Sequence, residues 1–183
     1  MKKYFIRYKP FLLFLTKFFL TFIILTVLYQ GFLGRFEDNK IDSITKLVAR
    51  NTEQLVGLFH TDVALEENKA ETFIKLLYNQ KYVARMIEGC NAISIIILFI
   101  SFVVSFSGKL KPTLLFIFGG SVVIYILNVM RIALLTVLMY HFPKQEPLLH
   151  GVLFPLFIYG VVFILWVIWV RKFSLYAKNT AVT

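Results

Sequence analysis

Three residues with reactive or charged side chains stand at the ends of, or inside, otherwise apolar segments. Cys90 is the only cysteine of the chain and stands two residues before the start of an apolar run, 92–106. Arg131 lies inside a second apolar segment, and His150 stands at the start of a third. A thiolate is a strong nucleophile, a histidine transfers protons near neutral pH, and a guanidinium can stabilise an oxyanion. Together the three side chains could catalyse acyl transfer.

Each of these residues also has an ordinary structural explanation. A lone cysteine in an apolar setting is usually an inert hydrophobic residue, and His150 alone is more often an interfacial residue than a catalyst. Arg131 differs, because an arginine inside an apolar span costs roughly a few kcal/mol or more and is functional by default unless it snorkels to the head groups. Asn128 lies one helical turn before Arg131 on the same face, so the pair predicts a polar patch that points at protein.

The composition predicts an integral membrane protein. Of the 183 residues, 58% are hydrophobic, whereas soluble domains have roughly 45–50% apolar residues. A membrane span takes about 20 apolar residues. Four segments suit this role, although the second is short: 11–33, 91–107, 113–140 and 151–170. We therefore predict an all-α fold, a multi-pass membrane helix bundle with four transmembrane helices that forms a single domain over residues 1–183.

The first span follows a basic start and is longer than the apolar core of a signal peptide, about 7–15 residues, so we expect it to be retained. Segment 34–88, between the first two spans, is the one soluble-looking stretch. Apolar residues recur at helical spacing over 41–59 and, more weakly, over 72–87. This spacing predicts two amphipathic helices that lie on or near the membrane surface.

Glycines and prolines predict local features of the bundle. The pair Gly119-Gly120 should let a neighbouring helix approach closely. Pro112 suits the first position of the third span, where its missing N–H costs nothing. Segment 141–149 contains two further prolines and is predicted to be a loop. Pro155 removes a backbone hydrogen bond near the start of the fourth span, which predicts a kink there.

The distribution of charge predicts the orientation. All ten acidic residues fall in segments 34–88 and 141–149. The termini and the turn between the second and third spans hold only basic charges: Lys2, Lys3, Arg7, Lys9, Lys109, Lys111, Arg171, Lys172 and Lys178. The positive-inside rule then places both termini in the cytoplasm. Cys90 and His150 are thereby predicted at the outer face, with Arg131 in the outer half of the membrane.

The sequence contains no motif typical of a metal or cofactor site. A single cysteine excludes an intrachain disulfide, and no CxxC motif or Cys/His cluster offers a zinc site. We therefore predict neither a metal nor a cofactor. The net charge of +10 could indicate nucleic acid binding. Because topology and attraction to anionic lipid account for the basic excess, the sequence predicts the lipid bilayer as a partner and no nucleic acid.

Cys90 before an apolar helix, Asn128-x-x-Arg131 in the next helix, and His150 at the head of the last resemble the exosortase/archaeosortase family. The resemblance covers roughly residues 48–169. Longer exosortases have additional N-terminal spans, so the chain looks like the compact exosortase F type. The resemblance implies a multi-pass transpeptidase of the bacterial cytoplasmic membrane, with Cys90, Arg131 and His150 as its active site and Asn128 in support.

The resemblance also implies a substrate and a mechanism. Members are thought to cut a C-terminal sorting signal of exported proteins, which consists of a short motif, a membrane helix and a basic tail. Cys90 would attack the scissile carbonyl and form a thioester, His150 would transfer the proton, and Arg131 would hold the oxyanion or the thiolate. An acceptor amine, or water, would resolve the intermediate.

Two functions of other classes remain open at this point. A small transporter or channel component is one, although the inner halves of the spans lack polar residues that could line a path across the membrane. A membrane scaffold without chemistry is the other, in which the three polar residues are interfacial. Unusual reactivity of Cys90 would distinguish an enzyme from a scaffold.

Overall fold

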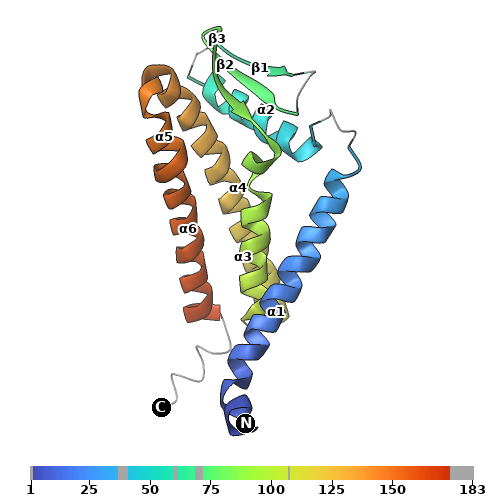
Figure 1. Cartoon of the computed structure of the whole chain (residues 1–183). Coiled ribbons are helices and arrows are strands. Elements are labelled where there is room, and N and C mark those ends of the chain that lie inside the picture. The colour runs from blue at the N-terminus through green and yellow to red at the C-terminus, as the bar shows by residue number, and fades with distance from the viewer. Residues whose placement is uncertain (1, 37–40, 60–61, 69–71, 107, 174–183) are drawn as a thin grey trace.

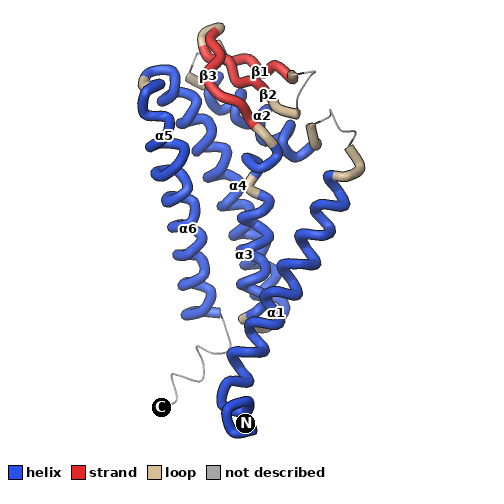
Figure 2. The backbone as a smooth tube through the Cα atoms, in the orientation of Figure 1, coloured by secondary structure: helices blue, strands red, loops and turns tan. Residues whose placement is uncertain are grey.

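The structure is a computed structural model that describes residues 2–36, 41–59, 62–68, 72–106 and 108–173. Helices form a bundle, and a small sheet lies at one end of it (Figures 1 and 2). The elements are α1 (Lys2–Leu33), α2 (Ser43–Gly57), β1 (Val63–Glu67), β2 (Ile74–Tyr78), β3 (Lys81–Met86), the 3-10 turn η1 (Glu88–Asn91), α3 (Ile93–Ser105), α4 (Leu110–His141), the 3-10 turn η2 (Pro143–Gln145), α5 (Glu146–Leu148), the π-helical turn η3 (Leu149–Leu153), α6 (Phe154–Ile168) and the π-helical turn η4 (Trp169–Phe173).

The predicted helical membrane bundle is confirmed. Within the described residues, three helical stretches are long and apolar enough to cross a membrane: Tyr8–Leu33, Leu110–His141 and Pro143–Phe173. Helix α3 has 13 residues, so it is about 20 Å long at 1.5 Å per residue, less than the roughly 30 Å of the hydrocarbon core. That α3 crosses the membrane as a fourth span therefore stays a prediction.

Helix α3 lies against both α1 and α4. At its contact with α4, the ring of Phe99 packs directly onto Gly120, where a Cβ would come within 2.6 Å of the Phe99 Cε1 atom. Gly119 is exposed and has no atom within 4 Å of the place of a Cβ. The predicted close approach of helices is thus right for Gly120 and wrong for Gly119.

Helix α2 is confirmed, but its apolar face differs from the predicted one. Asp42 caps the helix, because its carboxylate accepts the N–H groups of Ile44 and Thr45, each at 2.9 Å. The buried face consists of small and β-branched residues: Thr45, Val48, Ala49, Thr52 and Val56. Leu47, Leu58 and Phe59, which match the helical spacing, are exposed.

The predicted second amphipathic helix, over 72–87, is wrong. Strands β2 and β3 form a hairpin there, and β1 completes an antiparallel sheet of order β1-β2-β3. The residues at the turn, Asn79 and Gln80, both have positive φ, as a type I′ hairpin turn requires. In β2 the buried residues Ile74, Leu76 and Tyr78 alternate with half-buried ones, which is the period of two expected of a strand. The few apolar residues of 72–87 that also fit helical spacing led to the wrong prediction.

The segment predicted as a loop over 141–149 is mostly helical. It contains η2 and α5, and each has a proline in its first positions, where the missing N–H removes no hydrogen bond. The fourth span then begins in the π-helical turn η3, just before Pro155. The helical hydrogen bonding is thus irregular just before Pro155, which cannot donate to the preceding turn, and the kink itself stays a prediction.

Candidate active site

Cys90 lies in the tight turn η1, between the last strand of the sheet and the first residue of α3. Its N–H donates to the carbonyl oxygen of Ile87 at 2.9 Å. After the turn, Ala92 adopts a left-handed backbone conformation, with φ 63° and ψ 4°. The single cysteine is therefore held on a short, folded connection rather than in the regular helix, and its side chain is half-buried.

Asn91 anchors this turn to two other helices. Its side chain is 2% exposed, and its amide Nδ2 donates to the hydroxyl of Tyr29 in α1 at 2.7 Å and to Thr45 Oγ1 in α2 at 3.2 Å. Its Oδ1 accepts the N–H of Ile93, the first residue of α3, at 3.0 Å. The sequence reasoning missed Asn91, although a polar residue beside the cysteine and two residues before a helix was a capping signal.

Asn128 connects the turn to α4. It is 1% exposed, and its amide donates to the backbone carbonyl of Cys90 at 2.8 Å. Val129 and Ile132 of the same helix are in the buried cluster against which Cys90 packs. Asn128 therefore points at protein, on the side of α4 that meets the cysteine turn.

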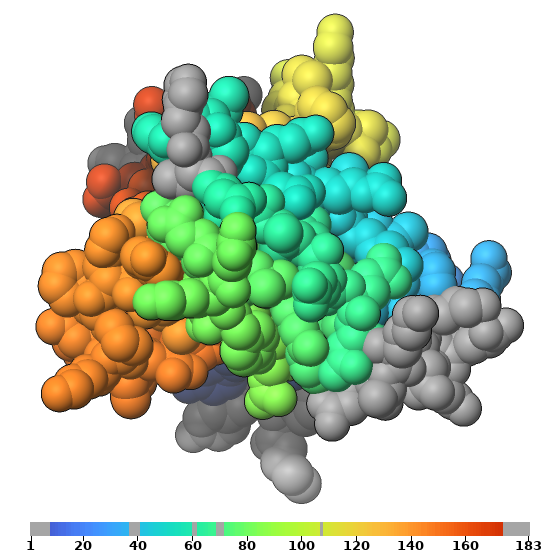
Figure 3. All heavy atoms as spheres, turned by 90° about the horizontal axis from the view of Figure 1, so that it is seen from above, coloured from blue at the N-terminus to red at the C-terminus, as the bar shows by residue number. Residues whose placement is uncertain are grey.

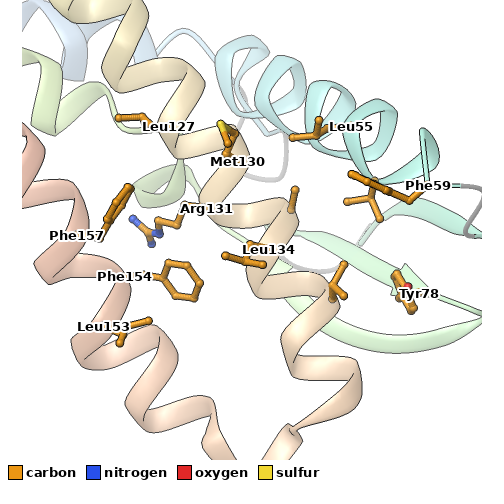
Figure 4. A pocket seen from close by; sticks show the side chains of 13 residues that line it. Leu55, Phe59, Tyr78, Leu127, Met130, Arg131, Leu134, Leu153, Phe154 and Phe157 are labelled. Carbon is orange, nitrogen blue, oxygen red and sulfur yellow. The ribbon is translucent and has the colours of Figure 1, made fainter.

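Arg131 lies one helical turn beyond Asn128, at the wall of a cavity of about 770 Å³. Figure 4 shows its guanidinium extending from α4 toward Phe154 and Phe157 of α6. The other lining side chains are apolar or aromatic, from α2, β2, α4 and the start of the last span: Leu55, Val56, Phe59, Tyr78, Leu127, Met130, Ala133, Leu134, Val137 and Leu153. The Nε atom of Arg131 is buried and has no hydrogen-bond partner among the described residues. It is a free donor in apolar surroundings.

His150 is exposed and lies in the π-helical turn η3. It precedes Phe154, which lines the cavity beside Arg131, by four residues. Across the described part of the chain, no hydrogen bond or ion pair joins the side chains of Cys90, Arg131 and His150. The structure thus brings Asn128 directly onto Cys90 and aims Arg131 at α6, whereas His150 reaches neither side chain.

Among the described residues, no group of three or more His, Cys, Asp or Glu side chains lies close enough together to hold a metal ion. The chemistry available at the site comes from a thiol, a guanidinium, an imidazole and two buried amides. These groups fit nucleophilic acyl transfer, because they supply a nucleophile, a donor for an oxyanion and a proton carrier.

Comparison with known proteins assigns the family. The family model of transmembrane exosortases matches residues 10–171, which include the cysteine turn, α4 and the last helix. No curated protein and no solved structure gives a significant match to the chain. Because the match extends over most of the sequence, from the first span to the end of the last, the chain belongs to the transmembrane exosortase family.

Proposed function

We propose that this multi-pass membrane protein is a cysteine transpeptidase that cleaves the C-terminal sorting signals of exported proteins. It would act at the extracytoplasmic face of the bacterial cytoplasmic membrane, with both of its termini in the cytoplasm. The observation that carries the proposal is the hydrogen bond of 2.8 Å from Asn128 to the carbonyl of Cys90. That bond fixes the only thiol of the chain against α4, one helical turn from a charged residue in an otherwise apolar wall.

The reaction begins at the Cys90 sulfur, which attacks the carbonyl carbon of the scissile peptide while the thiol proton passes to His150. The tetrahedral intermediate has a negatively charged oxygen. When it collapses, the bond from carbon to nitrogen breaks, and His150 returns the proton to the leaving amine. The product is a thioester between Cys90 and the exported protein. An acceptor amine, or water, then attacks the thioester and releases the thiol.

Arg131 is the proposed donor to the negatively charged oxygen. Its buried Nε–H has no partner among the described residues, so no existing hydrogen bond must break before it can bind a substrate oxygen. The walls around it are apolar. A charge interaction in such surroundings is stronger than in water, because little solvent screens it.

His150 is the proposed proton carrier. It is exposed at the start of the last span, and catalytic contacts are often long in a free enzyme and shorten when substrate binds. The neighbouring Gly151 has open space around it.

The described interior gives less support to a transporter. The buried hydroxyls of α3 are those of Ser101 and Ser105. Ser101 donates to the Ile97 carbonyl and Ser105 to the Ser101 carbonyl of the same helix. These two groups are paired with their own backbone, and the nearby buried polar atoms that lack a hydrogen-bond partner among the described residues, those of Ser121, Trp166 and Trp169, are uncharged.

The test is processing of a co-expressed exported protein that ends in a short motif, a membrane helix and a basic tail. Processing is followed by the size shift of that protein. The Cys90→Ala variant should abolish it, and Cys90→Ser should nearly do so, because a hydroxyl is much harder to ionise than a thiol. Ser94→Ala, at an exposed position on the first turn of α3, is the matched control and should process normally. Enzyme levels are compared by blot, and normal processing by Cys90→Ala would refute the proposal.

A further inference from the structure

Strand β3 is an edge strand of the sheet. It pairs with β2 on one side, and the sheet has the order β1-β2-β3. Among the described residues, no hydrogen bond from an element other than β2 reaches the backbone of β3. An edge strand presents a row of N–H and C=O groups on its open side, which can pair with another extended chain. Within the described part of the chain, the hydrogen-bonding groups of its outer edge are therefore not occupied by another element.

The same strand leads directly to the proposed nucleophile. β3 ends at Met86, four residues before Cys90. Met86 is 1% exposed and lies in one buried cluster with Val129 and Ile132 of α4, against which Cys90 also packs. Because the end of the strand and the cysteine turn share this support, a chain bound along β3 would be held in a fixed position relative to the sulfur.

Helix α4, which carries Arg131, contacts β2 and β3, and the segment that contains His150 lies beside β3 (Figure 3). The elements under the sheet are α2, which contacts β1, and α4, which contacts β3 and carries Arg131. In Figure 1, β3 is the strand on the side of the sheet nearest α5. Seen from above in Figure 3, the green residues that include β3 lie beside the orange residues of the segment that contains His150. Strand β1 lies at the opposite edge, over α2.

We propose that the outer edge of β3 binds, by strand addition, the extended segment of the substrate that precedes the scissile bond. The inference rests on the proposed transpeptidase function and adds the surface that receives the substrate. Main-chain hydrogen bonds of this kind give affinity with little dependence on sequence, and side-chain contacts at alternate positions add selectivity. At about 3.3 Å per residue, six residues of strand accommodate about six residues of substrate.

The direction of the bound substrate strand can be inferred from the directions in which β3 and the sorting signal run. β3 runs from the hairpin turn toward η1 and α3, that is, toward the bundle (Figure 1). A sorting signal has its short motif first and its membrane helix afterwards, so it also runs toward the membrane. The substrate segment is therefore parallel to β3, and its scissile bond lies beyond the level of Met86, at the turn η1 that holds Cys90.

Cysteine cross-linking tests this arrangement in the full-length protein. In the Cys90→Ser background, which has no other cysteine, one cysteine is placed at Arg85 on β3. The matched control has it at Glu66 on β1. Lys75 of β2 pairs with both residues, so they lie in one row of the sheet, and both are exposed. The probe is the sorting-signal protein of the processing assay, with single cysteines at successive positions before the scissile bond.

Oxidation to a disulfide needs Cβ atoms within about 4.5 Å, so it reports direct neighbours. The Arg85→Cys variant should cross-link to substrate positions on one face of the added strand. The substrate position between two such positions points to the other face and should not cross-link. Moving the cysteine from Arg85 to the exposed Tyr82, nearer the hairpin turn, should shift the cross-linked position toward the substrate N-terminus. The Glu66→Cys variant should not cross-link.

Several results would overturn the inference while leaving the proposed function intact. In each of them, processing still depends on Cys90. The Glu66→Cys variant cross-links to the substrate, or Arg85→Cys cross-links equally to successive substrate positions, or the enzyme forms cross-linked dimers in place of substrate adducts. A shift in the opposite direction would contradict the parallel arrangement. If the Cys90→Ala variant instead processed the substrate as well as the wild type does, both the proposed function and this inference would be refuted.

Discussion

Ala92 adopts a left-handed backbone conformation immediately after the turn that holds Cys90. For a residue with a Cβ this conformation costs roughly 1–2 kcal/mol, whereas glycine adopts it freely. The Ala92→Gly variant should therefore unfold at the same or a higher temperature than the wild type. Ala92→Val should lower stability by about 1 kcal/mol or more, because a β-branched residue strongly disfavours positive φ. Thermal unfolding in detergent measures both, and a marked loss on Ala92→Gly would argue against this conformation.

Arg131→Lys separates two roles of the charge. If Arg131 only extended to the head groups, lysine would replace it, because both have a long stem and a terminal charge. A donor to an oxyanion depends on the planar guanidinium, so the variant should process substrate about 10²–10³ times more slowly, the usual effect of losing one such donor. Single-turnover processing rates at matched enzyme levels measure it. Full activity would reduce Arg131 to a positive charge near the thiol.

The residues of the candidate site differ in how far sequence could identify them. Cys90, Arg131 and His150 stand out because each is a polar exception in apolar surroundings, and Asn128 follows from its helical spacing to Arg131. Asn91 could not be assigned in the same way. Its role depends on Tyr29 and Thr45, which lie far away in the chain and meet it only after folding.

At the scale of elements, the contact of α3 with α4 depends on the absence of a side chain at Gly120. An added Cβ would collide with the Phe99 ring, so Gly120→Ala should destabilise the protein by about 1–3 kcal/mol, as overpacking of a core does. Gly119→Ala is the control, because the site is open and alanine favours a helix interior by about 0.5–1 kcal/mol over glycine. Unfolding temperatures in detergent should fall only for Gly120→Ala. Equal effects of the two variants would contradict the packing.

Periodicity identified some elements and missed others for a physical reason. The long apolar helices were predictable because lipid requires continuous apolar runs. In the hairpin, short strands of five and six residues offer few repeats to distinguish a period of two from one of 3.6. The turn residues Asn79 and Gln80 also lack the glycine that usually marks such hairpins.

At the scale of the whole molecule, the start of α1 and the end of η4 lie at the same end of the bundle, away from the sheet (Figure 1). Reporter fusions at Lys109 and after Lys172 should therefore read cytoplasmic, and fusions at Glu67 and Lys144 extracytoplasmic. The segregation of acidic residues from the termini supports this orientation. A cytoplasmic signal at Glu67 would overturn it.

The same fusions test whether the short helix α3 crosses the membrane. Hydropathy locates apolar segments but does not fix how a helix of 13 residues meets a bilayer about 30 Å thick. Its ends, its tilt and local thinning of the lipid decide this. A cytoplasmic reading at Lys109 together with an extracytoplasmic reading at Glu67 would establish the crossing. Two identical readings would leave the bundle with three spans.

The central claim is that Cys90 forms a thioester with the substrate, and capture of that thioester tests it most directly. Hydroxylamine attacks thioesters at neutral pH and releases the acyl group as a hydroxamate. Membranes that contain the wild-type protein and the sorting-signal protein should yield the cleaved substrate with a C-terminal hydroxamate, detected by mass spectrometry, and the Cys90→Ala variant should yield none. A hydroxamate product that forms equally with Cys90→Ala, or cleaved substrate without any hydroxamate from the wild type, would contradict the mechanism.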